Sequence, residues 1–148
     1  MSKNLKRIII DVIVTLICVT LITGLFLYEK SKTKTTKYDE ENAKSTIVFQ
    51  LYDETGEMKI NDTLNFTDGE SIFDILNRNY ILGYKENAVG KAVTKVNEYE
   101  TNFTTCYFAF YVKKVDDEKP VYSNYGTERV KAEDKMEIEL IWTEIKLG

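Results

Sequence analysis

The sequence predicts an α+β domain that follows a long apolar segment at the N-terminus. Residues 8–28 contain a single charged side chain, that of Asp11. After residue 43, several segments place an apolar side chain at every second position, which is the pattern of half-buried strands. One segment near residues 71–80 instead has helical spacing. These observations together predict one small domain built from strands and a single helix.

The domain is expected to begin with a β-hairpin. In the segment 45–52, Ile47, Phe49 and Leu51 share one face of a strand. A turn at 53–56 contains Gly56, which can adopt a positive φ. A second strand is expected at about 58–66, with a bulge or kink near 61–62.

A helix is expected from about residue 71 to residue 80. Ser71 precedes the apolar stripe and has Asp74 three residues later, which is typical of a helix N-cap. Gly83 follows the last turn and suits a C-terminal cap.

The second half of the domain is expected to be a set of strands. Residues 84–91 are interpreted as a loop, 92–96 as a short strand, and 104–112 as the clearest strand of the chain. Residues 113–120 form an acidic turn, 121–125 are extended, and 136–143 form the last strand. The first and last strands are strongly apolar, which favours a place for both at the centre of a sheet. The order of the elements predicts a β-grasp-like mixed sheet with one helix.

The apolar segment 8–28 is predicted to be a single transmembrane helix, since about 20 apolar residues cross a bilayer core. A cleaved signal peptide is the alternative, but the apolar core is longer than usual and no small-residue cleavage pattern follows it. Lys3, Lys6 and Arg7 favour a cytoplasmic tail at 1–7, although lysines after the span oppose them. We therefore expect a signal anchor, a flexible polar stalk at 29–42, and an extracellular domain at 43–148 of a cell-membrane protein.

Composition restricts the classes of function. The chain has 20 Lys and Arg against 24 Asp and Glu, divided as 7 against 2 in residues 1–37 and 13 against 22 in residues 38–148. An acidic domain of this kind is a poor nucleic-acid binder. The sequence has no histidine, which removes histidine-dependent catalysis and histidine metal sites. Its 2 cysteines leave Cys106 as the only cysteine of the domain, so no disulfide can form within it, which suits a bacterial surface.

Four segments carry a resemblance to a known family. They are GESIFDIL at 69–76, YETNFTTCYFAFYV at 99–112, YSNYG at 122–126 and IELIWT at 138–143. In this order they resemble the bacterial transcobalamin-like C-terminal domains, a family of unknown function, over roughly residues 45–145. The resemblance implies a β-grasp-like fold on a bacterial surface. In the related vitamin B12 carriers, the smaller domain closes over the corrin ring. Nothing here corresponds to the larger helical domain of those carriers, so cobalamin binding is not transferred, and the acidic segment 114–120 replaces the tight turn usual in the family.

Aromatic and amide side chains suggest a ligand-binding surface where the loop 97–103 meets the loop 121–126, because rings supply contact area and amides fix orientation. The alternative is that these side chains only cover a sheet and satisfy turns. The candidate ligand-binding residues are Tyr99, Asn102, Phe103, Tyr122, Asn124 and Tyr125.

Other chemistry-bearing residues are interpreted as structural. Cys106 shares the parity of Phe108 and Phe110, which predicts a buried thiol rather than a nucleophile. Trp142 has the parity of the last strand's core residues, with a ligand platform as the alternative. The acidic runs 39–41 and 116–118 lack the spacing of a calcium loop, so no metal and no cofactor is expected.

We expect a membrane-anchored, extracellular, non-catalytic module that binds a small molecule or a surface protein. The alternative is an accessory or structural subunit of a membrane assembly at the cell surface. The sequence does not identify the ligand, the partner or the oligomeric state.

Overall fold

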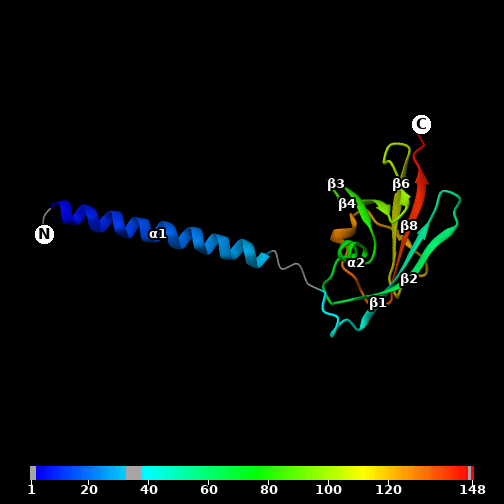
Figure 1. The fold of residues 1–148 in the computed structure, drawn as a ribbon, viewed down its shortest axis with the longest axis horizontal. Coiled ribbons are helices and arrows are strands. Elements are labelled where there is room, and N and C mark those ends of the chain that lie inside the picture. Colours follow the sequence, from blue (N-terminus) through cyan, green and yellow to red (C-terminus); the bar gives the residue numbers. More distant parts are fainter. Residues whose placement is uncertain (1–2, 33–37, 147) are drawn as a thin grey trace. The chain divides into compact units, whose positions relative to one another are not determined.

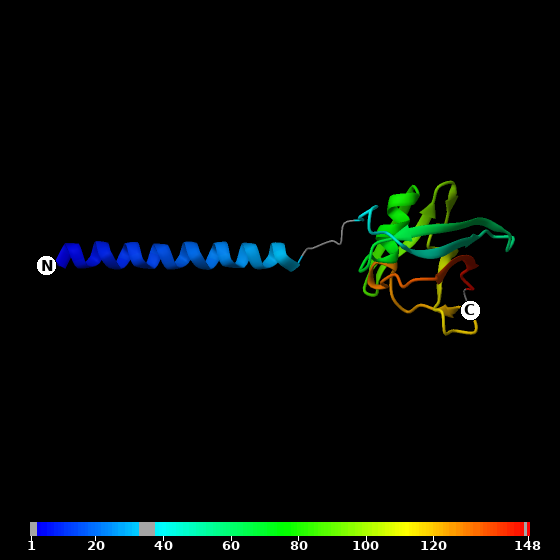
Figure 2. The same ribbon diagram turned by 90° about the horizontal axis from the view of Figure 1, so that it is seen from below.

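A computed structural model describes residues 3–32, 38–146 and 148, with side chains described from residue 8 to residue 23 in the first helix. The chain divides into two units, residues 1–35 and residues 36–148. The first unit is the helix α1 (Lys3–Lys32), in which the side chains of 8–23 are exposed. Figures 1 and 2 show the fold of the second unit, which combines strands with a short helix.

The helix α1 extends beyond the predicted span at both ends, into the predicted tail 1–7 and the predicted stalk 29–42. Residues 1–2 and 33–37, which belong to that tail and stalk, lie outside the described residues. In the part of the chain that the structure describes, no helix is both long and apolar enough to cross a membrane. The span at 8–28 therefore stays a prediction.

The second unit is a mixed α+β domain. Its strands are β1 (Ser45–Tyr52), β2 (Met58–Phe66), β3 (Leu82–Asn87), β4 (Gly90–Val96), β5 (Tyr99–Glu100), β6 (Cys106–Lys113), β7 (Val121–Tyr122) and β8 (Met136–Glu144). The helix α2 (Ile72–Asn79) and the 3-10 helix η1 (Thr127–Arg129) complete the described elements. One sheet has the order β2-β1-β8-β6-β7, and the other has the order β3-β4-β5.

The larger sheet confirms the prediction that the first and last strands both lie away from its edges. β1 and β8 are parallel, with Phe49 opposite Ile138 and Leu51 opposite Leu140. All four of these side chains are at most 1% exposed. They form the core together with the apolar face of α2, so the helix is held by burial of Ile72, Ile75 and Leu76.

The hairpin β1–β2 and the N-cap of α2 are also confirmed. The Ser71 side chain accepts a hydrogen bond from the Asp74 backbone N–H at 3.1 Å and donates one to the Asp74 carboxylate at 2.8 Å. The bulge or kink was expected near 61–62, and this position is wrong. The register shifts between Leu51 and Tyr52, so the extra residue on β2 lies near Lys59.

Two expectations for residues 83–91 are wrong. The segment predicted as a loop is the strand β3 with a turn into β4, where Asn87 pairs with Gly90. The helix ends where it was expected to, at Asn79 with Tyr80 as its C-cap, but Gly83 lies within β3 and does not cap it. A Cβ on Gly83 would lie 2.9 Å from the Lys95 Cβ, so the glycine permits close contact between these strands rather than capping the helix.

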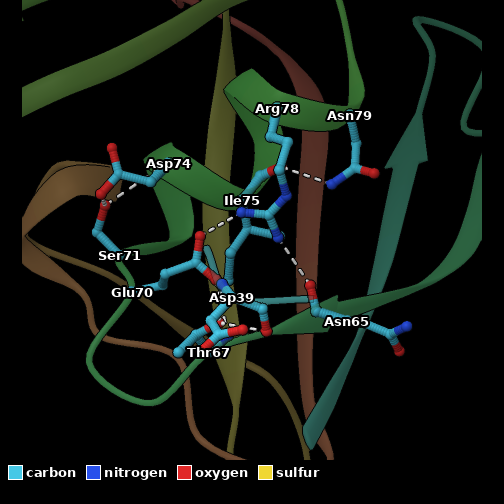
Figure 3. Close-up of polar contacts among 9 residues, drawn as sticks. All are labelled: Asp39, Asn65, Thr67, Glu70, Ser71, Asp74, Ile75, Arg78 and Asn79. Carbon is cyan, nitrogen blue, oxygen red and sulfur yellow. Dashed lines mark hydrogen bonds and ion pairs between the residues drawn. The ribbon is translucent and has the colours of Figure 1, made fainter. Parts of the chain in front are cut away.

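Residues 38–42, predicted as part of a flexible stalk, are instead held on the domain. The Asp39 backbone N–H donates to the Thr67 hydroxyl at 2.8 Å, and the Tyr38 ring lies 3.7 Å from the Arg78 guanidinium. Arg78 in turn pairs with Glu70, whose side chain is 1% exposed, and donates to the Asn65 carbonyl at 2.8 Å (Figure 3). The folded domain therefore begins before Ala43, because side chains distant in sequence bind this segment.

Candidate functional site

The candidate site is a pocket of about 110 Å³ between the two sheets, which we call the loop pocket. Its outer wall comes from the turn 102–105 and from the segment 122–126, and its floor from β4, β6 and β8. The aromatic and amide residues that line it are Asn87, Phe103, Tyr107, Phe108, Phe110, Tyr122, Asn124 and Tyr125.

Four of the residues selected from the sequence line this pocket, namely Phe103, Tyr122, Asn124 and Tyr125. They come from segments separated by about twenty residues and meet because β7 pairs with β6, with Tyr122 opposite Tyr111. The two remaining candidates lie elsewhere. Asn102 organises a turn, and Tyr99 lines a different hollow together with Trp142.

The Asn102 side chain fixes the first wall of the loop pocket. Its Oδ1 accepts hydrogen bonds from the backbone N–H groups of Thr104 and Thr105, both at 2.8 Å. The Phe103 N–H donates to the Cys106 carbonyl at 2.9 Å, and Phe103 adopts a positive φ of 59°. A non-glycine residue in this backbone region is held there by its surroundings. The turn therefore presents the Phe103 ring to the pocket, 6.3 Å from the Tyr107 ring.

The segment 122–126 is fixed just as firmly. The Ser123 N–H donates to the Phe110 carbonyl at 2.8 Å, and the Gly126 N–H donates to the Val89 carbonyl at 2.8 Å. A Cβ on Gly126 would lie 2.3 Å from the Lys91 backbone nitrogen, so only glycine allows this approach to β4. Both walls of the loop pocket thus have their backbone positions set by the protein itself.

Glu128 fixes the start of β4 beneath the pocket. Its Oε2 accepts a hydrogen bond from the Lys91 backbone N–H at 2.6 Å, and the Thr127 hydroxyl donates to the Lys91 carbonyl at 3.2 Å. The Lys91 ammonium is directed to aromatic faces, 4.4 Å from the Phe73 ring centre and 4.8 Å from that of Tyr84. Such cation–π contacts hold the side chain in place.

The pocket wall is largely tyrosine and apolar. Burial raises the pKa of Tyr107, and the nearby Tyr122 and Tyr111 raise it further, so Tyr107 stays a neutral hydroxyl at physiological pH. The Tyr122 side chain is 48% exposed and that of Tyr125 is 62% exposed. These rings offer accessible aromatic faces beside hydroxyl and amide groups, which suits a neutral ring or another flat group.

The residues interpreted as structural are placed as follows. Cys106 is 7% exposed, which confirms the buried thiol. Trp142 is half-buried against the core and also lines the second hollow. Its position is therefore compatible with a core residue and with a ligand platform. Asp39 and Asp117 accept hydrogen bonds within their own turns. Within the described residues, no three Cys, Asp or Glu side chains gather in a way that could hold a metal ion.

Sequence reasoning missed the contribution of β4 and of the 126–128 segment to this pocket. The sequence offered a partial signal in the two glycines Gly90 and Gly126. In the structure, a Cβ at either position would collide with Glu128 or the β4 backbone. Isolated glycines in a strand or loop often mark such close approach.

Comparisons with known proteins support the fold. No family model matches the chain, and no curated protein matches its sequence. Among solved structures, a protein from Ruminococcus gnavus with a provisional metal-binding description aligns over 70% of this chain and 100% of its own, with a TM-score of 0.53 and 14% identity. Haptocorrin in complex with Cbi aligns over 69% of this chain, with a TM-score of 0.54 and 10% identity. The chain corresponds to only 25% of the haptocorrin chain, so the likeness concerns one part of that protein.

Proposed function

We propose that the domain is a non-catalytic module that binds a small molecule in the loop pocket. One observation carries the proposal. Aromatic and amide side chains from the 102–105 turn and the 122–126 segment converge on one pocket whose two walls are fixed by backbone hydrogen bonds. A wall that is ordered before binding loses little conformational entropy when the ligand arrives, which favours affinity.

The dimensions of the pocket suggest what part of a ligand it holds. A volume of about 110 Å³ exceeds that of a single water molecule several-fold but accommodates only one ring-sized group. Larger ligands would be held at one edge, with the exposed Tyr122 and Tyr125 rings against their flat face. The likeness of the fold to haptocorrin in complex with Cbi supports testing corrinoids among the first ligands.

We further propose that the domain is a β-grasp-like relative of the transcobalamin-like C-terminal domains. The parallel pair β1–β8 at the centre of the larger sheet and the single helix α2 support this assignment. A binding role without catalysis is supported by the absence of histidine from the sequence.

The proposal includes a membrane tether for this module, with the domain outside the cell. Its support is the low charge of residues 8–28, together with the exposed apolar side chains of the described part of α1, such as Ile8 and Leu21 at 58% and 61% exposure. Flotation of the full-length chain with lipid vesicles tests the tether. Recovery of the protein from the vesicle-free fraction would contradict it.

Thermal denaturation of the full-length chain tests the binding function. A panel of corrinoids, disaccharides and nucleosides is added at increasing concentration, with one nonionic detergent held constant in all samples. A ligand present at 100 times its Kd stabilises a protein by about 2.7 kcal/mol, which raises the Tm by on the order of 10 °C in a domain of this size. A saturable rise for one class of ligand supports the proposal, and no rise for any class contradicts it.

Two tyrosine variants locate the binding. Tyr122 and Tyr84 are both 48% exposed, but only Tyr122 lines the loop pocket. We expect Tyr122→Ala to remove the ligand-dependent rise in Tm and Tyr84→Ala to retain it.

A further inference from the structure

A second hollow, which we call the acidic hollow, lies at the turns that close the hairpin β1–β2 and connect β4 to β5. It has a volume of about 280 Å³ and shares Phe108 with the loop pocket, but it contains none of the residues 122–126. It is lined by Asp53, Glu54, Glu98, Tyr99, Glu100, Phe108 and Trp142. An aromatic base and a rim of carboxylates therefore meet in one concave surface.

The base of the acidic hollow is built on two paired strands of the larger sheet. Phe108 on β6 lies directly opposite Trp142 on β8, and Phe108 is 6% exposed. Trp142 and Tyr99 are half-buried, so each keeps part of its surface open to the hollow. The faces of tryptophan and tyrosine rings carry negative electrostatic potential and attract cations, tryptophan most strongly.

The rim of the acidic hollow adds formal negative charge. The Asp53 carboxylate accepts hydrogen bonds from the Thr55 hydroxyl at 2.6 Å and from the Glu57 backbone N–H at 3.1 Å. The Thr55 hydroxyl is the main reason that the pKa of Asp53 falls to about 2, so this carboxylate is ionised at any physiological pH. Lys59 approaches it at 3.3 Å and also binds Glu57.

The remaining carboxylates leave the rim negative overall. Lys95 lies 3.8 Å from Glu100, which is a loose ion pair on the surface. Glu54 and Glu98 are exposed on the two turns that face the hollow. Burial raises the pKa of Tyr99, and the charge of Glu98 raises it further. Four carboxylates therefore face two lysines around the aromatic rings.

We propose that the acidic hollow binds a small organic cation of the alkylammonium class, with the methylated nitrogen on the Trp142 and Tyr99 rings and the carboxylates around it. A quaternary nitrogen suits this surface because it is large, weakly hydrated and has no hydrogen-bond donor to satisfy. Aromatic surfaces with nearby negative charge recognise such cations. A hard metal ion suits it less, because such ions need several oxygen ligands converging on one point.

Binding in the acidic hollow can be followed by fluorescence, because Trp142 is the single tryptophan of the sequence. The full-length protein is titrated with choline while the tryptophan fluorescence is recorded, with sodium chloride as the control for ionic strength. The neutral isostere 3,3-dimethyl-1-butanol, in which carbon replaces the charged nitrogen, is titrated in parallel. We expect a saturable change with choline and none with the isostere or with sodium chloride. Equal responses to choline and to the isostere would overturn the proposal, and so would no response to choline.

Variants separate a specific site from general attraction to an acidic protein. Tyr99→Leu removes one ring, and we expect a roughly 3- to 10-fold weaker response to choline. Glu98→Gln is expected to weaken it as well, whereas Glu118→Gln, which removes an exposed charge from the 114–120 turn, is expected to leave it unchanged. If Glu98→Gln and Glu118→Gln change the choline response by the same amount, the proposal is overturned. Tyr122→Ala disables the loop pocket and is expected to leave the choline response intact, so failure of one site is distinguishable from failure of the other.

Discussion

Replacement of Arg78 by alanine is expected to be among the most destabilising single changes to the domain surface. The guanidinium pairs with the Glu70 carboxylate and donates to the Asn65 carbonyl (Figure 3). It also covers the Tyr38 ring. The Glu70 side chain is 1% exposed, whereas that of Arg78 is 27% exposed. The variant therefore removes the partly exposed cation but leaves the buried Glu70 carboxylate without it.

The expected magnitude follows from that burial. Removing one partner of a buried ion pair costs about 3–5 kcal/mol, because the remaining charge is uncompensated. Loss of the Tyr38 contact adds about 0.5–1 kcal/mol. A domain of this size has a total stability of about 5–15 kcal/mol, so the loss is a large share of it. The remaining bond to Glu70, from the Thr67 backbone N–H at 2.8 Å, does not replace the lost charge.

Urea unfolding, followed by the fluorescence of Trp142, measures this loss as a lower midpoint at constant slope. Arg129→Ala is the matched control, since Arg129 is half-exposed and lies 3.7 Å from Glu128 in a surface pair. We expect a loss of at most about 1 kcal/mol for the control. Adding Glu70→Gln to Arg78→Ala is expected to recover part of the loss, because a buried amide costs less than a buried charge. Equal losses for Arg78→Ala and Arg129→Ala, or no recovery in the double variant, would refute the reasoning.

Three further predictions concern pH and the pocket wall. The pKa of Asp53 is lowered from 3.8 to about 2, so the stabilisation that its carboxylate provides is complete above pH 4 and is lost as the pH falls through 2. Asp53→Asn should therefore reduce the difference between urea midpoints measured at pH 7 and pH 2, and an unchanged difference would contradict this assignment. Burial, followed by the charge of Glu137, raises the pKa of Glu139, so its ionisation opposes folding above the unfolded-state pKa. Glu139→Gln should raise the urea midpoint at pH 7 and have little effect near pH 4. A larger rise near pH 4 than at pH 7 would contradict this reasoning. Asn102→Ala removes the acceptor that holds the 102–105 turn. It should clearly weaken ligand binding in the loop pocket while changing the Tm of the free protein only slightly. Calorimetric titration beside thermal denaturation checks this, and unchanged affinity would argue against a role for the turn.

Local patterns predicted those elements whose side chains alternate between a core face and an exposed face. β1 is an example, because Ile47, Phe49 and Leu51 are each 0% exposed and lie at every second position. The N-cap at Ser71 was predictable for a similar reason, since the partner Asp74 is only three residues away. In both cases the determining interactions lie within the segment itself.

The elements that were missed depend on partners elsewhere in the chain. β3 has no buried residue, so its strand character comes only from pairing with β4. Tyr38 reads as part of a polar stalk until Arg78 is brought beside it. Tyr99 was assigned to the candidate site because it shares the loop 97–103 with Asn102 and Phe103, but the pairing of β5 with β4 places Tyr99 in the acidic hollow.

Binding in the loop pocket is tested most directly by one comparison of two variants with the wild-type chain. The ligand of the panel that raises the wild-type Tm most is titrated into Tyr122→Ala and Tyr84→Ala, whose replaced side chains have equal exposure. We predict a saturable, one-to-one rise in Tm for the wild type and Tyr84→Ala, and its loss in Tyr122→Ala. An equal rise in both variants would contradict the account.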